Sequence, residues 1–165
     1  MESRVKLLGH PIHPMLIVFP LGLLATAVLF DVLYALSGNA DLATFSYYAL
    51  IAGVVGGLLA AVFGLLDWMK IPKETRARRI GALHGAGNVV VTGLFLLSLA
   101  SRWGDPQYLP NSLPLILGVL GAVLALFTAW LGGELVYRLR VAVDDDAHLD
   151  ASNSIAREGI AEVRT

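Results

Sequence analysis

Four long apolar runs, separated by short polar segments, dominate the chain. They cover about residues 14–36, 45–69, 80–100 and 113–137. An α-helix rises 1.5 Å per residue, so each run is long enough to cross the roughly 30 Å hydrocarbon core of a bilayer. The pattern therefore predicts four membrane-spanning helices.

The connections between these runs are short and polar, and short connections place consecutive helices side by side and antiparallel. We therefore expect an all-α integral membrane protein, an up-down bundle of four transmembrane helices formed by residues 1–143. Residues 144–165 form a polar, acidic tail in which SIAREGIAEV is the one candidate for a surface helix. No internal repeat is evident from the residues alone.

Composition and charge support the same class. The chain is 56% hydrophobic and 15% charged, whereas soluble domains carry about 25% charged residues. Of the 12 basic residues, only Arg102 lies outside the segments before the first run, between the second and third, and after the fourth. Basic residues favour the cytoplasmic side, so we expect both termini to be cytoplasmic. Anionic lipid is the expected partner of this basic surface, and no feature favours nucleic acid.

Small residues recur at four-residue spacing within the apolar runs. Gly53, Gly57 and Ala61 share one stripe of the second helix, and Gly121 with Ala125 begins another in the fourth. Such stripes allow helix backbones to approach closely, which predicts a tight bundle or a homodimer through these faces. Pro20 lies inside the first helix, where it cannot donate to the carbonyl of Leu16, and predicts a kink.

Polar residues within or beside the apolar runs fall at one depth, near the expected cytoplasmic face. With a rise of 1.5 Å per residue, they occupy a layer on the order of 10 Å thick. The members are His10, His13, Asp67, His84, Asn88 and Glu134. Ionisable groups inside a membrane are costly and usually face the bundle interior, so this layer is the candidate functional site.

Two kinds of cofactor suit this layer. His10, His13, Asp67, His84 and Glu134 together offer the nitrogen and oxygen ligands of a zinc, iron or manganese ion. Alternatively, His84 with His10 or His13 provides the two axial imidazoles of a b-type haem, with Asn88 hydrogen-bonded behind them. The absence of cysteine excludes thiolate ligands and covalent haem attachment.

Each of these residues also has a purely structural interpretation. His13 can cap the first helix, and His84 can hydrogen-bond a neighbouring carbonyl. Asp67 and Glu134 can form interfacial ion pairs with Lys70 and Arg138, which lie close in sequence. At the opposite end, pairing of Asp31 with Arg102 is a further hypothesis.

Four motifs resemble one family of bacterial membrane proteins. They are GHPIHPMLIVFP at 9–20, LLDW at 65–68, ALHGAGN at 82–88 and WLGGELVY at 130–137. In this order and spacing they are similar to the family catalogued as domain of unknown function 2231. The resemblance implies a four-helix, multi-pass protein of the bacterial inner membrane, with His10, His13, Asp67, His84, Asn88 and Glu134 at motif positions. Fusion of some members to Rieske or cytochrome c domains implies a redox setting.

Three functions follow from this sequence. The first is a haem- or metal-binding membrane subunit that passes electrons to a partner protein or a quinone. The second is a non-haem metal site, structural or hydrolytic. The third is a non-catalytic assembly or transport protein, in which the polar layer is a hydrogen-bond network.

Overall fold

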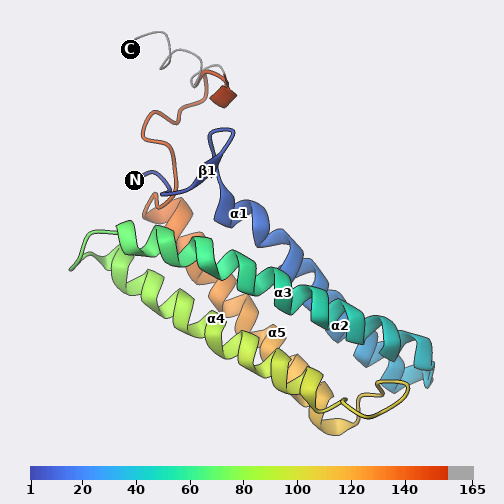
Figure 1. Cartoon of the computed structure of the whole chain (residues 1–165). Helices are drawn as coiled ribbons and strands as arrows, with labels where there is room; N and C mark the ends of the chain where they lie inside the picture. Colours follow the sequence, from blue (N-terminus) through green and yellow to red (C-terminus); the bar gives the residue numbers. More distant parts are fainter. Residues whose placement is uncertain (156–165) are drawn as a thin grey trace.

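The computed structural model describes residues 1–155 and consists mostly of helices. Four spans are long and apolar enough to cross a membrane: Ile12–Ser37, Ala40–Lys70, Arg76–Ala100 and Ser112–Arg138. They run alternately up and down, as the short connections predicted (Figure 1). Most of the expected surface helix in the tail, together with Arg157 and Arg164, lies outside the described residues.

The first span is interrupted at Ile17. It consists of α1 (Ile12–Leu16) and α2 (Val18–Ser37). Pro20 has no N–H to donate to the carbonyl of Leu16, and the regular helix breaks beside that carbonyl. The interruption predicted from Pro20 is therefore present.

Two helices begin earlier than their apolar runs indicated. Helix α3 spans Ala40–Lys70, and the side chain of Asn39 caps it by accepting from the N–H of Asp41 at 3.1 Å. Helix α4 spans Arg76–Ala100, and Thr75 caps it in the same way. The predicted starts near 45 and 80 were wrong because polar first turns were assigned to the loops, although capping side chains extend both helices into them.

The fourth span changes its helical geometry near the end that carries the polar layer. Helix α5 covers Ser112–Gly133, and a π-helical turn, η1, covers Glu134–Arg138. Short π-helical segments are often found at functional sites. This turn carries Glu134, one of the six candidate residues.

A small β-hairpin precedes the first helix and was not expected. Strand β1 (Lys6–Leu7) pairs with β2 (His10–Pro11) in antiparallel register. Leu8 and Gly9 both have positive φ angles, 52° and 78°, as a two-residue type I′ turn requires. His10 therefore lies on a strand outside the helical bundle.

The bundle core joins all four spans. Ala27, Leu50, Val54, Val91 and Phe95 form one buried cluster at its centre. Helices pack closely where glycine faces a large side chain. A Cβ on Gly53 would lie 2.7 Å from Leu24, and one on Gly121 would lie 3.0 Å from Phe95. The small-residue stripes thus serve packing within one chain.

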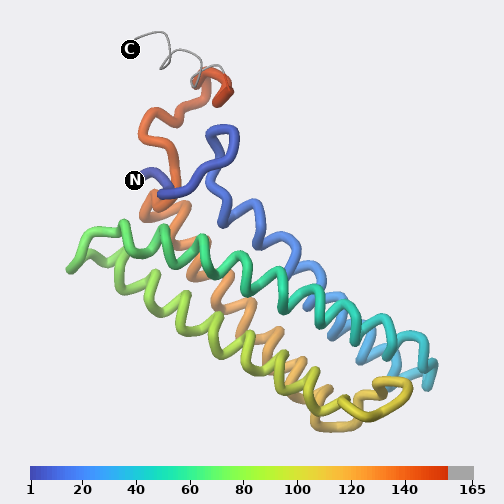
Figure 2. The backbone as a smooth tube through the Cα atoms, in the orientation of Figure 1, coloured from blue at the N-terminus to red at the C-terminus, as the bar shows by residue number. Residues whose placement is uncertain are grey.

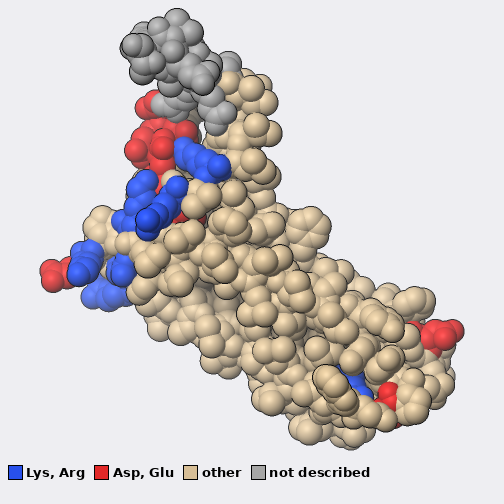
Figure 3. Space-filling view, viewed as in Figure 1, with Lys and Arg blue, Asp and Glu red and all other residues tan. Residues whose placement is uncertain are grey.

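Charged side chains gather at one end of the bundle, the end at which the N-terminus lies (Figure 3). The chain returns to this end after η1, where the amino group of Met1 donates to the carbonyl oxygen of Arg140 at 3.2 Å and pairs with Asp145 at 3.1 Å. The N-terminus and the start of the tail therefore share one side of the bundle. Their cytoplasmic placement stays a prediction from the basic residues.

Candidate functional site

His13 of α1 is held by helix α3. Its Nδ1 lies 2.8 Å from the carbonyl oxygen of Ala60. Gly64, one turn further along α3, faces the same ring, because a Cβ there would lie 2.8 Å from His13 Cε1. The ring therefore fills a space that any larger residue at position 64 would occupy. His13 does not cap its own helix, since Pro11 holds the cap position and no side chain bonds there.

His84 of α4 is held by helix α5 in a similar way. Its Nδ1 lies 2.8 Å from the carbonyl oxygen of Thr128. Gly132, again one turn further along, faces the ring, and a Cβ there would lie 3.2 Å from His84 Cε1. The hydrogen bond to a neighbouring carbonyl that the sequence indicated for His84 is thus present, and His13 has one as well.

The two rings meet across the bundle. Their centroids are 6.5 Å apart and their planes are at 89°. A carbonyl oxygen can only accept a hydrogen bond, so Nδ1 carries the proton in both rings, and in the neutral imidazole Nε2 holds the lone pair. Histidines that ligate metals usually have this arrangement, with one nitrogen donating to a carbonyl and the other free to bind.

Asn88 and Thr128 extend the polar network from His84. The Asn88 amide nitrogen lies 2.8 Å from the carbonyl oxygen of His84 and 3.3 Å from its Nε2. The Thr128 hydroxyl donates to Asn88 Oδ1 at 3.2 Å. Asn88 therefore stands behind His84 as the sequence indicated, and it donates to the nitrogen that a ligand would need.

The other three candidate residues have different partners. His10 is exposed on β2, and its Nε2 lies 3.4 Å from the hydroxyl of Ser154 in the tail. Glu134 accepts from Arg76 at 2.7 Å, rather than from Arg138. Both side chains are thus engaged away from the histidine pair.

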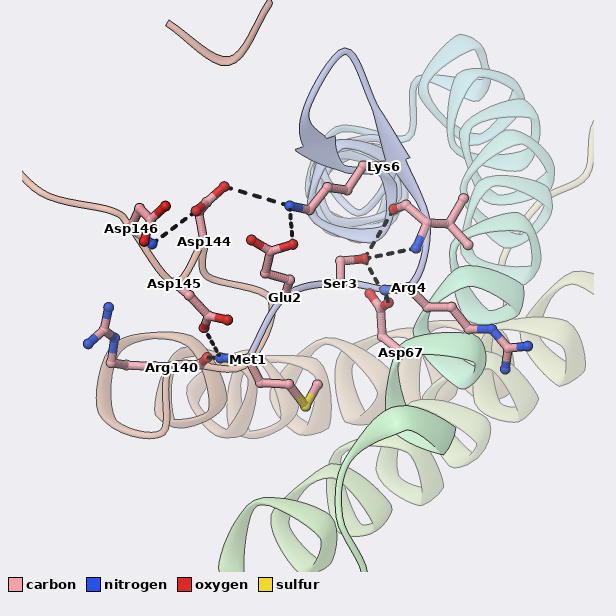
Figure 4. Close-up of polar contacts among 11 residues, drawn as sticks. Met1, Glu2, Ser3, Arg4, Lys6, Asp67, Arg140, Asp144, Asp145 and Asp146 are labelled. Atoms are coloured by element: carbon pink, nitrogen blue, oxygen red, sulfur yellow. Dashed lines mark hydrogen bonds and ion pairs between the residues drawn. The ribbon is translucent and has the colours of Figure 1, made fainter. Parts of the chain in front are cut away.

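Asp67 is buried, and its carboxylate docks the N-terminal segment onto α3. It accepts from the Ser3 hydroxyl at 2.7 Å and from the backbone N–H of Arg4 at 2.6 Å. Around this contact, Lys6 pairs with Glu2 and with Asp144 of the tail (Figure 4). The hydrogen bond from Lys6 to Glu2, together with the attraction of both carboxylates, raises the pKa of Lys6.

The expected five-ligand metal set is therefore not brought together. Within residues 1–155, no group of three or more His, Asp or Glu side chains is placed to hold a metal ion. One depth along the membrane normal does not imply one point in the plane. His10, Asp67 and Glu134 lie in the same layer as the histidine pair but bind other neighbours.

A second polar cluster lies at the opposite end of the bundle. The Arg102 guanidinium pairs with both carboxylate oxygens of Asp31, with Nη1 at 2.9 Å from Oδ1. It also lies 3.3 Å from the hydroxyls of Ser46 and Ser98. The predicted pairing of Asp31 with Arg102 is confirmed, and the pair is buried inside the bundle.

Sequence reasoning missed the residues that seat the two rings. Thr128, Gly64 and Gly132 were treated as ordinary helix-packing positions, and Ala60 contributes only a backbone carbonyl. One signal was available: Ala60 precedes Gly64 by four residues, and Thr128 precedes Gly132 by four.

One comparison with known proteins gives a match. The family model described as "Predicted membrane protein (DUF2231)" matches residues 9–145. No curated protein and no solved structure matches the chain. The matched region contains all six candidate residues.

Proposed function

Because the chain belongs to the DUF2231 family of predicted membrane proteins, whose description states no activity, we propose from the site itself that it is a redox subunit of the membrane. His13 and His84 bind a haem or a metal ion that carries electrons. The observation that carries this proposal is the setting of the two rings. Each donates Nδ1–H to a backbone carbonyl at 2.8 Å, which leaves Nε2 as the donor to a ligand.

The position of the pair suits electron transfer across the membrane surface. His13 lies one residue after the start of α1, at the end of the bundle where the N-terminus and the basic residues gather. A cofactor there is near the aqueous phase on one side and near lipid on the other. It can therefore exchange electrons with a partner protein or with a quinone dissolved in the bilayer.

A second candidate function rests on the same residues. The Asn88 amide nitrogen lies 3.3 Å from His84 Nε2, so the polar layer satisfies part of its own hydrogen bonding without a ligand. In that case, the histidines connect the helices and the protein serves assembly or transport. This candidate predicts that the purified protein contains neither haem nor a transition metal.

A reduced-minus-oxidised visible spectrum of protein purified in mild detergent separates these functions. Sharp α and β bands support a haem subunit. Elemental analysis of the same sample for zinc, iron and manganese tests the non-haem site. Folded protein from haem-supplied cells that shows no bands and no stoichiometric metal refutes the redox proposal and favours the network.

A further inference from the structure

We propose that residues 12–70 and 76–138 are two equivalent helical hairpins, related by a pseudo-two-fold axis, and that His13 and His84 are equivalent axial ligands of one b-type haem on that axis. The choice of haem rests on the function proposed above. The equivalence of the hairpins does not, because it follows from packing alone. Each hairpin leaves the end with the N-terminus, reaches the far end and returns (Figure 2).

The two histidine settings correspond residue by residue. His84 follows His13 by 71 residues on the first helix of each hairpin. On the second helix, Thr128 follows Ala60 by 68 residues, and Gly132 follows Gly64 by the same 68. Ring, carbonyl and glycine therefore match with one constant offset for each helix.

The apolar packing follows the same offsets. Gly53 receives Leu24 in the first hairpin, and Gly121 receives Phe95 in the second. Phe95 follows Leu24 by 71 residues, and Gly121 follows Gly53 by 68. Packing within the hairpins is independent of the polar site, so this agreement is a separate observation.

The far end of the bundle supplies a third correspondence. Arg102 follows Asp31 by 71 residues, and these two equivalent positions meet as the buried ion pair. Both contacts, His13 with His84 and Asp31 with Arg102, thus join a position to its own counterpart. A residue meets its own counterpart only at a two-fold axis. The two pairs are 18 residues apart along the helix, or about 27 Å at 1.5 Å per residue, so the axis runs along the bundle.

Two hairpins that start from the same side are parallel repeats, whose axis lies along the membrane normal. The sequence signal is weak because few identical residues support it. The identical pairs at these offsets in the matched helices include His13 with His84, Gly22 with Gly93, Gly53 with Gly121, Ala61 with Ala129, and Gly64 with Gly132.

The number of protein ligands decides which cofactor fits the axis. Each hairpin offers one imidazole, and within the described residues no carboxylate joins them to complete a metal shell. A b-type haem needs only two axial ligands, because its macrocycle provides the four equatorial nitrogens. Two imidazoles on opposite sides of one metal, each with a metal–nitrogen bond of about 2 Å, have ring centres roughly 6 Å apart. The observed centroid separation is 6.5 Å.

The two ligands differ in one respect. Asn88 donates to Nε2 of His84 in this structure, and it must release this nitrogen when the haem binds. The equivalent position in the first hairpin is Ile17, which has no polar side chain. Replacing Asn88 by alanine removes this competitor, and we expect it to leave the bis-histidine spectrum intact.

The site is tested by titrating detergent-solubilised full-length protein with hemin. We expect one haem per chain with a six-coordinate, low-spin spectrum. His13→Ala and His84→Ala should each give a high-spin spectrum and a loss of affinity of about tenfold or more. His10→Ala is the matched control and should behave as wild type. Two haems per chain, or a low-spin spectrum retained by either single variant, would overturn the shared site while leaving a haem protein.

The hairpin equivalence is tested without any ligand. The chain has no cysteine, so paired cysteines report single contacts. A Cβ on Gly118 would lie 3.4 Å from Val28, and the symmetry counterparts of these positions are Leu50 and Leu99, both at the central cluster. We expect V28C/G118C and L50C/L99C each to form an intramolecular disulfide, whereas L29C/V119C, one residue further on each helix, should not.

The two experiments fail in different ways. If both disulfides form but hemin does not bind, the hairpins are equivalent, and the haem site fails together with the proposed redox function. If L50C/L99C does not form while V28C/G118C does, the pseudo-two-fold axis is wrong whatever the protein binds.

Discussion

Removing one partner of the Asp31–Arg102 pair should destabilise the bundle strongly. The side chain of Arg102 is 0% exposed and that of Asp31 is 2% exposed. In Asp31→Leu, the guanidinium keeps only the hydroxyls of Ser46 and Ser98, each at 3.3 Å. A buried charge that loses its partner typically costs 3–5 kcal/mol, so we expect about 4 kcal/mol in the free energy of unfolding.

The double variant D31L/R102M gives the sharper result. It removes both charges and fills the site with apolar side chains of similar volume, a change that is often neutral or stabilising in other proteins. We expect its cost to lie well below the sum of the single variants. The coupling free energy between positions 31 and 102 should then reach several kcal/mol, above the roughly 0.5–3 kcal/mol of most neighbouring pairs.

The assay is reversible unfolding in mixed micelles of mild detergent and sodium dodecyl sulfate, followed by far-UV circular dichroism. Asp41→Asn is the matched control, because Asp41 is exposed in the first turn of α3, and its cost should stay below about 1 kcal/mol. A cost of less than about 1 kcal/mol for Asp31→Leu would refute the inference that the pair is buried and unreplaced. Additive single and double variants would refute the direct contact.

Two further predictions concern the histidine seats and the N-terminal segment. Gly64→Ala should weaken hemin binding more than Gly132→Ala, because the added Cβ lies 2.8 Å from the first ring and 3.2 Å from the second; Gly93→Ala, with open space around it, should bind hemin as wild type, and an inverted order in the hemin titration would contradict the seating. Because the pKa of Lys6 is raised in the folded protein, its contribution to docking is complete below the ordinary lysine pKa of about 10.4 and is lost as pH rises through the folded value. Amide exchange of residues 1–7, corrected for intrinsic rates, should therefore accelerate above that range in wild type but show no such step in Lys6→Met.

Hydrophobic length was sufficient to predict the four spans, because a bilayer requires about 20 apolar residues for each helix. The same criterion placed the starts of α3 and α4 too late. Asn39 and Thr75 cap those helices through side-chain oxygens, and a capping residue does not change the apolar run that follows it. The β-hairpin was missed because Leu8 occupies a turn position that asparagine or glycine usually holds.

The candidate site was predicted by depth and only partly by neighbourhood. Depth follows from the rise per residue, and it correctly placed His13 and His84 in one layer. Which residues meet within that layer depends on the rotation of each helix, and nearly uniform apolar runs do not specify it. His10, Asp67 and Glu134 are therefore in the layer but not at the pair. The repeat escaped notice because its halves share spacing more than residue identity.

The EPR spectrum of the ferric, hemin-loaded protein tests the central claim most directly. The carbonyls of Ala60 and Thr128 fix the two ring planes, which are at 89°. Axial imidazoles with perpendicular planes give a highly anisotropic low-spin signal, whereas parallel planes give an ordinary rhombic one. We predict the anisotropic signal, lost in both His13→Ala and His84→Ala. A rhombic signal would contradict the carbonyl-anchored pair, and the absence of any low-spin haem signal would contradict the haem site itself.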